Sequence, residues 1–194
     1  MAKPVVELCQ IVEKEQLTFV EGEIVFRLVL KAPQIAAGCT FGQFVHVKCG
    51  KDAYLRRPIS ICDAENGLLT LVIGVKGAGT RALFARNVGD VVDILGPLGD
   101  GVFTPKAQYA HPVMVGGGIG IFPLYMLAKT YKDESATILG FRSKALITMK
   151  EAFAGTGTAL AITTDDGSFG HHGFVTDLLK EKIDAGLCGC PNIR

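Results

Sequence analysis

The first hundred residues are divided into short β-forming runs by residues that favour turns. Glu21-Gly22, Ala37-Gly38, Asn66-Gly67 and Val88-Gly89-Asp90 mark these turns. Asn66-Gly67 between two apolar runs is a strong signal for a tight hairpin. Six strands of this length predict a small antiparallel Greek-key barrel with one helical interruption at 80–86. The expected strands are 5–12, 24–30, 44–47, 59–62, 68–75 and 91–95.

The second half of the sequence has a different pattern, in which β-forming runs alternate with helical ones. Strands are expected at 113–115, 136–141 and 159–163, and helices at 119–131, 145–153 and 174–183. Such alternation predicts a parallel sheet covered by helices. The fold class is therefore a six-stranded antiparallel barrel followed by a Rossmann-like α/β domain. We predict domains at 1–105 and 106–194.

Charge and hydropathy exclude several classes of partner. Lys+Arg of 20 against Asp+Glu of 19 gives a net charge of +1, which provides no electrostatic footprint for nucleic acid or an anionic membrane. The apolar stretch 112–128 is interrupted by three glycines and Pro123, and a span requires about 20 apolar residues. Six scattered cysteines without a signal peptide favour a reducing cytoplasm.

Three motifs have residue types that suit phosphate binding. The first is Arg56-Arg57-Pro58-Ile59-Ser60, in which a fixed arginine followed by a hydroxyl suits a pyrophosphate and a polar ring edge. An arginine pair at a strand start can equally be a solvated edge. The second is Gly77-Ala78-Gly79-Thr80, where glycines let backbone amides approach a phosphate at the start of a helix. An ordinary glycine turn capped by Thr80 is the alternative.

The third motif is Gly116-Gly117-Gly118-Ile119-Gly120, directly after a strand and before a helix. That is the context of a dinucleotide-binding turn. The strict G-x-G-x-x-G fingerprint fails because Ile121 occupies its last glycine position. A pyrophosphate-binding turn is still expected, with Pro123 in the first turn of the following helix.

In order and spacing, these three motifs together resemble the ferredoxin-reductase family of flavoproteins. Two further runs look like the branch formed by the electron-transfer subunits of dihydroorotate dehydrogenase B: Asp165-Asp166-Gly167-Ser168-Phe169-Gly170 and Gly173-Phe174-Val175-Thr176-Asp177-Leu178-Leu179. Residues 55–61 and 139–144 are similar to that branch too. The resemblance covers nearly the whole chain.

This resemblance implies FAD and NAD as cofactors and assigns residues to them. Arg57 would bind the FAD pyrophosphate and Ser60 would lie at the isoalloxazine edge, with Pro58 between them. Ile59 stands where many relatives have an aromatic residue that stacks on the flavin. The remaining residues expected to bind FAD are Val72, Ile73, Gly74, Gly79 and Thr80, and those expected to bind NAD are Gly116, Gly117, Gly118, Ile119 and Gly120.

The resemblance also implies a partner, an FMN-containing dihydroorotate dehydrogenase catalytic subunit that carries out the substrate chemistry. Hydride transfer between nicotinamide and flavin requires alignment rather than a proton-abstracting base. We accordingly expect His171-His172 to be solvent-exposed and Asp165-Asp166 to shape the turn around Gly167. NAD is favoured over NADP, although Arg142-Ser143-Lys144 could receive a 2′-phosphate.

The C-terminal end departs from the family pattern. The family continues with a cysteine-rich tail that binds a [2Fe–2S] cluster, which requires four thiolates. Here only Cys188 and Cys190 lie near the end. The hypothesis is that the chain is truncated and cannot hold the cluster by itself. Two alternatives are an NAD(P)H-ferredoxin or sulfide-type reductase subunit of the same family, and a truncated FAD-binding or partner-docking module without turnover.

Overall fold

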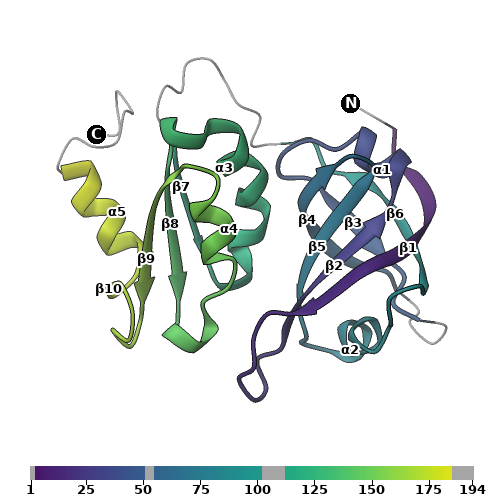
Figure 1. The fold of residues 1–194 in the computed structure, drawn as a ribbon, viewed down its shortest axis with the longest axis horizontal. Coiled ribbons are helices and arrows are strands. Elements are labelled where there is room, and N and C mark those ends of the chain that lie inside the picture. The colour runs from purple at the N-terminus through teal and green to yellow at the C-terminus, as the bar shows by residue number, and fades with distance from the viewer. Residues whose placement is uncertain (1–2, 51–54, 102–111, 185–194) are drawn as a thin grey trace. The chain divides into compact units, whose positions relative to one another are not determined.

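The computed structural model describes residues 3–50, 55–101 and 112–184. The chain divides into two compact units, Met1–Thr104 and Pro105–Arg194 (Figure 1). The expected domain boundary near residue 105 falls outside the described residues, as do Cys188 and Cys190.

Six antiparallel strands of the first unit close into a barrel, as predicted. Their order around the barrel is β1-β2-β5-β4-β3-β6, so the first strand pairs with the last. The predicted hairpin turn joins β4 to β5, with φ of 53° at Asn66 and 76° at Gly67. The strands are β1 (Val5–Gln16), β2 (Val25–Lys31), β3 (Phe44–Val47), β4 (Arg57–Glu65), β5 (Leu68–Gly74) and β6 (Val91–Leu98).

Besides β6, which continues from residue 95 to Leu98, two strands of the barrel are longer than the apolar pattern predicts. β1 continues beyond residue 12 through a charged segment, where Glu13 and Glu15 both form salt bridges with Arg27 on the paired strand β2, at 3.1 and 3.0 Å. β4 begins two residues early and ends at Glu65. Polar residues in both extensions are accommodated because alternate strand positions face solvent.

Two helices accompany the barrel, although only one was predicted. α2 (Ala78–Phe84) begins two residues before the expected 80–86. α1 (Pro33–Ala37) is an addition, with Pro33 at its start. Its first amides are capped from β1: the backbone N–H groups of Gln34 and Ile35 donate to the buried Glu7 carboxylate at 3.2 and 2.9 Å. A cap 27 residues away leaves no local sequence signal.

The second unit contains a four-stranded parallel sheet in the order β10-β9-β8-β7. Figure 1 shows α3 and α4 on one side of this sheet and α5 on the other. The strands are β7 (Val113–Gly117), β8 (Ala136–Phe141), β9 (Ala159–Thr164) and β10 (His171–His172), and the α-helices are α3 (Tyr125–Tyr131), α4 (Lys150–Ala154) and α5 (Val175–Asp184). The Rossmann-like arrangement is confirmed.

Four details of the second unit differ from the sequence predictions. The expected helix 119–131 begins as the 3-10 helix η1 (Gly118–Leu124) and becomes α-helical only at Tyr125, after Pro123. Pro123 therefore lies inside η1 rather than in the first turn of α3. The expected helix 145–153 is divided into the 3-10 helix η3 (Lys144–Leu146) and α4. β10, expected as a loop, pairs with β9. A further short 3-10 helix, η2 (Lys132–Glu134), follows α3.

Within the described residues, none of the helices has both the length and the apolar character needed to cross a bilayer.

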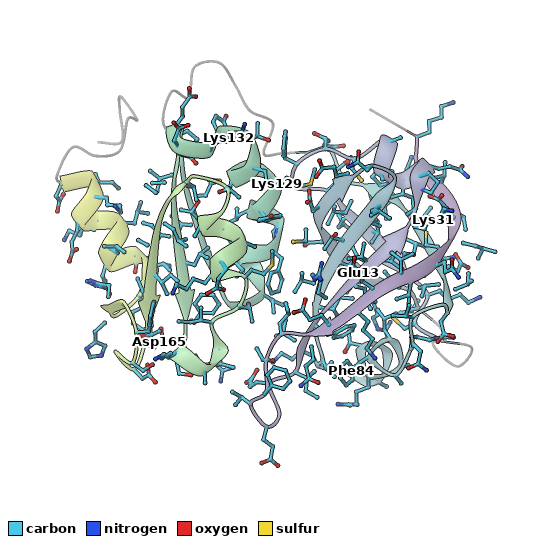
Figure 2. The ribbon with its side chains drawn as sticks, viewed as in Figure 1. Glu13, Lys31, Phe84, Lys129, Lys132 and Asp165 are labelled. Carbon is cyan, nitrogen blue, oxygen red and sulfur yellow. The ribbon has the colours of Figure 1, made fainter. Side chains whose placement is uncertain are left out.

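We predict that Glu7→Ala lowers the free energy of unfolding by about 1–3 kcal/mol, because it leaves the buried Ile35 amide and the part-buried Gln34 amide of α1 without an acceptor. The matched control is Glu13→Ala, since Glu13 is exposed and its salt bridge is expected to contribute less than about 1 kcal/mol (Figure 2). Urea denaturation followed by far-UV circular dichroism measures both. Equal losses in the two variants would contradict a capping role for Glu7.

Candidate functional site

The two adjacent arginines at the start of β4 have different roles. The Arg56 guanidinium contacts Asp93 on β6, with Nη2 2.8 Å from Oδ1 and Nη1 3.1 Å from the backbone oxygen. Because β3 lies between β4 and β6, Arg56 ties three strands together. Arg57 donates to the Leu55 carbonyl at 2.9 Å and forms no salt bridge within the described residues. Arg57 is therefore the arginine that remains for an anionic ligand.

The Arg57 side chain lies across the beginning of α2. A Cβ added at Gly79 would lie 2.9 Å from Arg57 Nε and 3.2 Å from its Cγ. Both distances are shorter than ordinary van der Waals contacts, so a side chain at position 79 would require the Arg57 side chain to move. The absence of a side chain there brings a guanidinium next to the first turn of a helix, where backbone amides have no intrahelical partner.

Local hydrogen bonds fix the turn that leads into α2. Thr80 Oγ1 accepts from the backbone N–H groups of Lys76 and Gly77, at 2.9 and 3.1 Å. The hydroxyl that was expected to hold phosphate thus shapes the turn, as in the alternative of a Thr80-capped glycine turn. A phosphate contact at Gly79 and Thr80 stays a prediction, with the backbone amides as its donors.

The other end of α2 is anchored by a residue that the sequence did not single out. Lys14 Nζ donates to the carbonyl oxygens of Phe84 and Arg86 and lies 4.7 Å from the centre of the Phe84 ring. Phe84 is labelled in Figure 2. Phe84 in turn contacts Phe26 of β2, with 5.1 Å between ring centroids. Lys14 lies in the charged extension of β1, some 70 residues from its partners, so no local pattern indicates its role.

The other residues expected to contact flavin lie on β4 and β5. Pro58 and Ser60 are exposed and share one face of β4, while Ile59 is half-buried on the opposite face. The Val72 and Ile73 side chains are buried, so these residues can offer only backbone groups to a ligand. Gly74 follows at the end of β5. The structure brings Arg57 and Gly79 into contact, whereas Ser60 lies three residues further along its strand.

The described cysteines of the barrel are buried or half-buried thiols. Burial raises the pKa of Cys39 to about 12, and burial with the nearby Glu7 and Asp93 carboxylates raises that of Cys9 to about 12. Burial also raises the pKa of Cys49, although the positive charge of Arg57 opposes the shift. The raised pKa values disfavour the thiolate form of Cys9, Cys39 and Cys49, as is usual for structural buried cysteines.

In the second unit, the glycine-rich segment forms the turn between β7 and η1. A Cβ at Gly116 would lie 2.8 Å from Leu124 Cδ1 and 3.1 Å from the Gly120 carbonyl oxygen, so glycine is required there. Gly118 has φ of 54°, in the left-handed region. Gly117, Gly118, Ile119 and Gly120 are all exposed, and a Cβ at Gly118 or Gly120 would meet nothing within 4 Å. The turn thus exposes backbone at the carboxyl end of a parallel strand.

The loop after β9 closes on the loop after β8 at the same edge of the sheet. Asp165 begins this loop (Figure 2). Asp166 Oδ1 accepts from the Ser168 hydroxyl at 2.5 Å and from its N–H at 3.0 Å, and these bonds lower the Asp166 pKa. Ser168 Oγ also accepts from the Lys144 N–H at 2.7 Å. Asp166 therefore shapes the turn around Gly167, as predicted.

Two further polar groups lie near this edge. Thr163 Oγ1 is fully buried and is the one described buried side-chain atom without a hydrogen-bond partner. His172 is exposed, as expected, and His171 is half-buried, because β10 extends the sheet here.

Both sites fit the cofactors that the sequence analysis implies. In the barrel, the space that a Cβ at Gly79 would fill is occupied by Arg57, which leaves a cation and unpaired amides together for the pyrophosphate of FAD. In the second unit, the open glycine turn at the carboxyl end of β7 lets a dinucleotide approach the backbone closely.

Comparison with known proteins gives a consistent result. Residues 8–103 match the family model described as "Oxidoreductase FAD-binding domain". The chain is 43% identical over 150 residues to "Dihydroorotate dehydrogenase B (NAD(+)), electron transfer subunit" of Bacillus caldolyticus, covering 73% of this chain and 58% of the relative. It is 37% identical over 181 residues to the protein of that name from Geobacillus thermodenitrificans, covering 87% and 70%.

Solved structures show the same fold. The NADH-dependent reduced ferredoxin-NADP oxidoreductase, described for flavin-based electron bifurcation, matches with a TM-score of 0.75 and 30% identity, covering 91% of this chain and 63% of that one. A cytochrome P450 reductase from Amycolatopsis matches with a TM-score of 0.77 and 24% identity, covering 93% and 59%. The second likeness concerns the fold alone.

We predict that Gly79→Ala weakens FAD binding at least about 10-fold, because the added Cβ displaces the Arg57 side chain, and a charge-assisted contact contributes about 1.5–3 kcal/mol. Gly77→Ala is the matched control, since a Cβ there meets nothing within 4 Å and φ is −139°. Fluorescence titration of the flavin-free protein with FAD gives both dissociation constants. Similar dissociation constants for the two variants would argue against FAD binding by Arg57 in its position over Gly79.

Proposed function

Because this chain belongs to the family of dihydroorotate dehydrogenase B electron transfer subunits, we propose that it passes electrons between NAD(H) and a partner dihydroorotate dehydrogenase through FAD. The observation that carries the proposal is the contact between Arg57 and Gly79, which places a guanidinium over the start of α2 within the FAD-binding domain. The exposed glycine turn of the second unit supports the binding of NAD(H) as the second cofactor.

The chain's own residues bind and orient, and none is needed as an acid or base. Arg57 would neutralise the FAD pyrophosphate, and the first amides of α2 would donate to it. Lys14 and Thr80 keep α2 in place for that contact. The exposed backbone from Gly117 to Gly120 would bind the pyrophosphate of NAD. When bound, FAD supplies the ability to exchange a hydride with nicotinamide and to release electrons singly.

The partner and the substrate belong to the proposal. The chain spans 58% of the length of the Bacillus caldolyticus relative and 63% of that from Shouchella clausii. We propose that oxidation of dihydroorotate, a step of pyrimidine biosynthesis, takes place on a separate FMN-containing subunit. A [2Fe–2S] cluster, if the complex uses one, would need ligands beyond the described cysteines, which are distributed through the barrel.

One observation favours a second candidate. The 30% identity with the NADH-dependent reduced ferredoxin-NADP oxidoreductase is compatible with an electron-transfer subunit that serves a ferredoxin-type acceptor. The two candidates share the NADH–flavin half-reaction and differ in the acceptor. Adding the FMN-containing subunit or ferredoxin to the reduced protein distinguishes them, because only the correct acceptor reoxidises the flavin rapidly.

The first test is the anaerobic visible spectrum of the FAD-loaded protein during titration with NADH. We expect the flavin bands to bleach, and to do so faster with NADH than with equimolar NADPH. The full-length relative from Geobacillus thermodenitrificans serves as the positive control. Bound FAD that stays oxidised with both nucleotides would contradict electron transfer and favour a binding module without turnover.

We also predict that Gly120→Val raises the NADH concentration needed for half-maximal flavin reduction about 10-fold. Its side chain would project into open space, so the fold is expected to persist while the ligand is kept from the backbone. FAD affinity, measured in parallel, should stay within twofold of wild type, because Gly120 lies in the other unit. If the NADH concentration for half-maximal reduction is unchanged, the glycine turn does not bind the dinucleotide.

A further inference from the structure

The loop between β1 and β2 is closed by its own hydrogen bonds and carries an exposed aromatic residue, Phe19. The Thr18 hydroxyl accepts from the Val25 N–H at 2.8 Å and donates to the Glu23 carbonyl, which closes the loop on itself. Thr18 is 1% exposed, whereas Phe19 next to it is 83% exposed. Because Thr18 is buried and held by hydrogen bonds, the neighbouring Phe19 side chain points to the outside of the barrel. A single exposed apolar side chain is common on protein surfaces, so Phe19 is of interest only because of where its loop lies.

The loop lies at the same end of the barrel as Arg57 and the start of α2, which together form the proposed pyrophosphate site. The Val75 N–H donates to the Ile24 carbonyl at 2.8 Å, so the segment after β5 continues alongside the loop. Lys76 Nζ then forms a salt bridge with Glu23 Oε2 at 3.1 Å. The Lys76 N–H donates to Thr80 Oγ1 inside α2. Three consecutive contacts thus connect the Phe19 loop to the helix start that Arg57 covers.

A dinucleotide held by its pyrophosphate extends in two directions. In FAD the flavin lies on one side of the phosphates and the adenosine on the other, and each planar ring is stabilised by an apolar face. Among the described residues of the barrel, Phe19 is the one aromatic side chain that is mostly exposed. Stacking of a nucleobase on an aromatic ring contributes about 1–3 kcal/mol by alanine substitution.

From this arrangement we propose that Phe19 stacks on the adenine ring of FAD, so that the β1–β2 loop forms an adenine subsite beside the pyrophosphate cradle. The inference rests on the proposed function, because it assumes that FAD binds at Arg57 and α2. It adds a specificity determinant: the loop would make the barrel prefer FAD to FMN, which lacks the adenosine.

The experiment compares dissociation constants for FAD and FMN in flavin-free wild type, Phe19→Ala, Phe19→Trp and the control Leu8→Ala. Leu8 is 72% exposed on β1, where it pairs with Asp93 of β6 rather than with the loop. We expect Phe19→Ala to weaken FAD binding about 10-fold and to leave FMN binding within twofold. Phe19→Trp should retain the preference for FAD, and Leu8→Ala should change neither constant. Circular dichroism checks that each variant is folded.

Each other outcome overturns the proposal. If Phe19→Ala leaves the ratio of FAD to FMN affinity unchanged, Phe19 does not form an adenine subsite, although the flavin site itself could still be correct. Equal weakening of both flavins assigns Phe19 a structural role instead. Wild-type protein that binds neither flavin would overturn the subsite together with the proposed function.

Discussion

The double pairing of β1 is the constraint on which the barrel and its site depend. Residues Val5 to Gln10 pair with β6 and close the barrel, and Gln10 to Gln16 pair with β2. A single strand therefore closes the sheet and also extends along β2 as far as the Phe19 loop. From the same strand, Glu7 caps α1 and Lys14 anchors α2. Removing the pairing would release both helices as well as the closing edge.

α2 is held at both ends by groups from outside the helix, which explains how a seven-residue element can have a defined position. Thr80 ties its beginning to Lys76, and Lys14 binds the carbonyl oxygens at its end. The Lys14 cation at the carboxyl end of α2 has the sign that the helix dipole favours. Because both ends are fixed, the position of the helix start does not depend on a ligand.

Much of this architecture could be predicted from the sequence, because alternation and turn chemistry act locally. β3 and β8 have the predicted bounds, and the Asn66-Gly67 turn has the expected positive φ values. Interactions between distant segments could not be predicted. The β1 extension depends on Arg27 across the sheet, and α1 depends on Glu7. The motifs indicated candidate site residues, but the different contacts of Arg56 and Arg57 depend on Asp93, a residue 37 positions from Arg56.

The close approach of Arg57 to Gly79 has a consequence for reading related sequences. The Arg57 side chain occupies the volume that a side chain at position 79 would need, so a larger residue at 79 would change the conformation of Arg57. A relative with any side chain at 79 must redirect or replace its arginine, and its helix start would then lack the cation. A glycine at 79 is therefore the residue that lets the Arg57 side chain keep its present course over the start of α2.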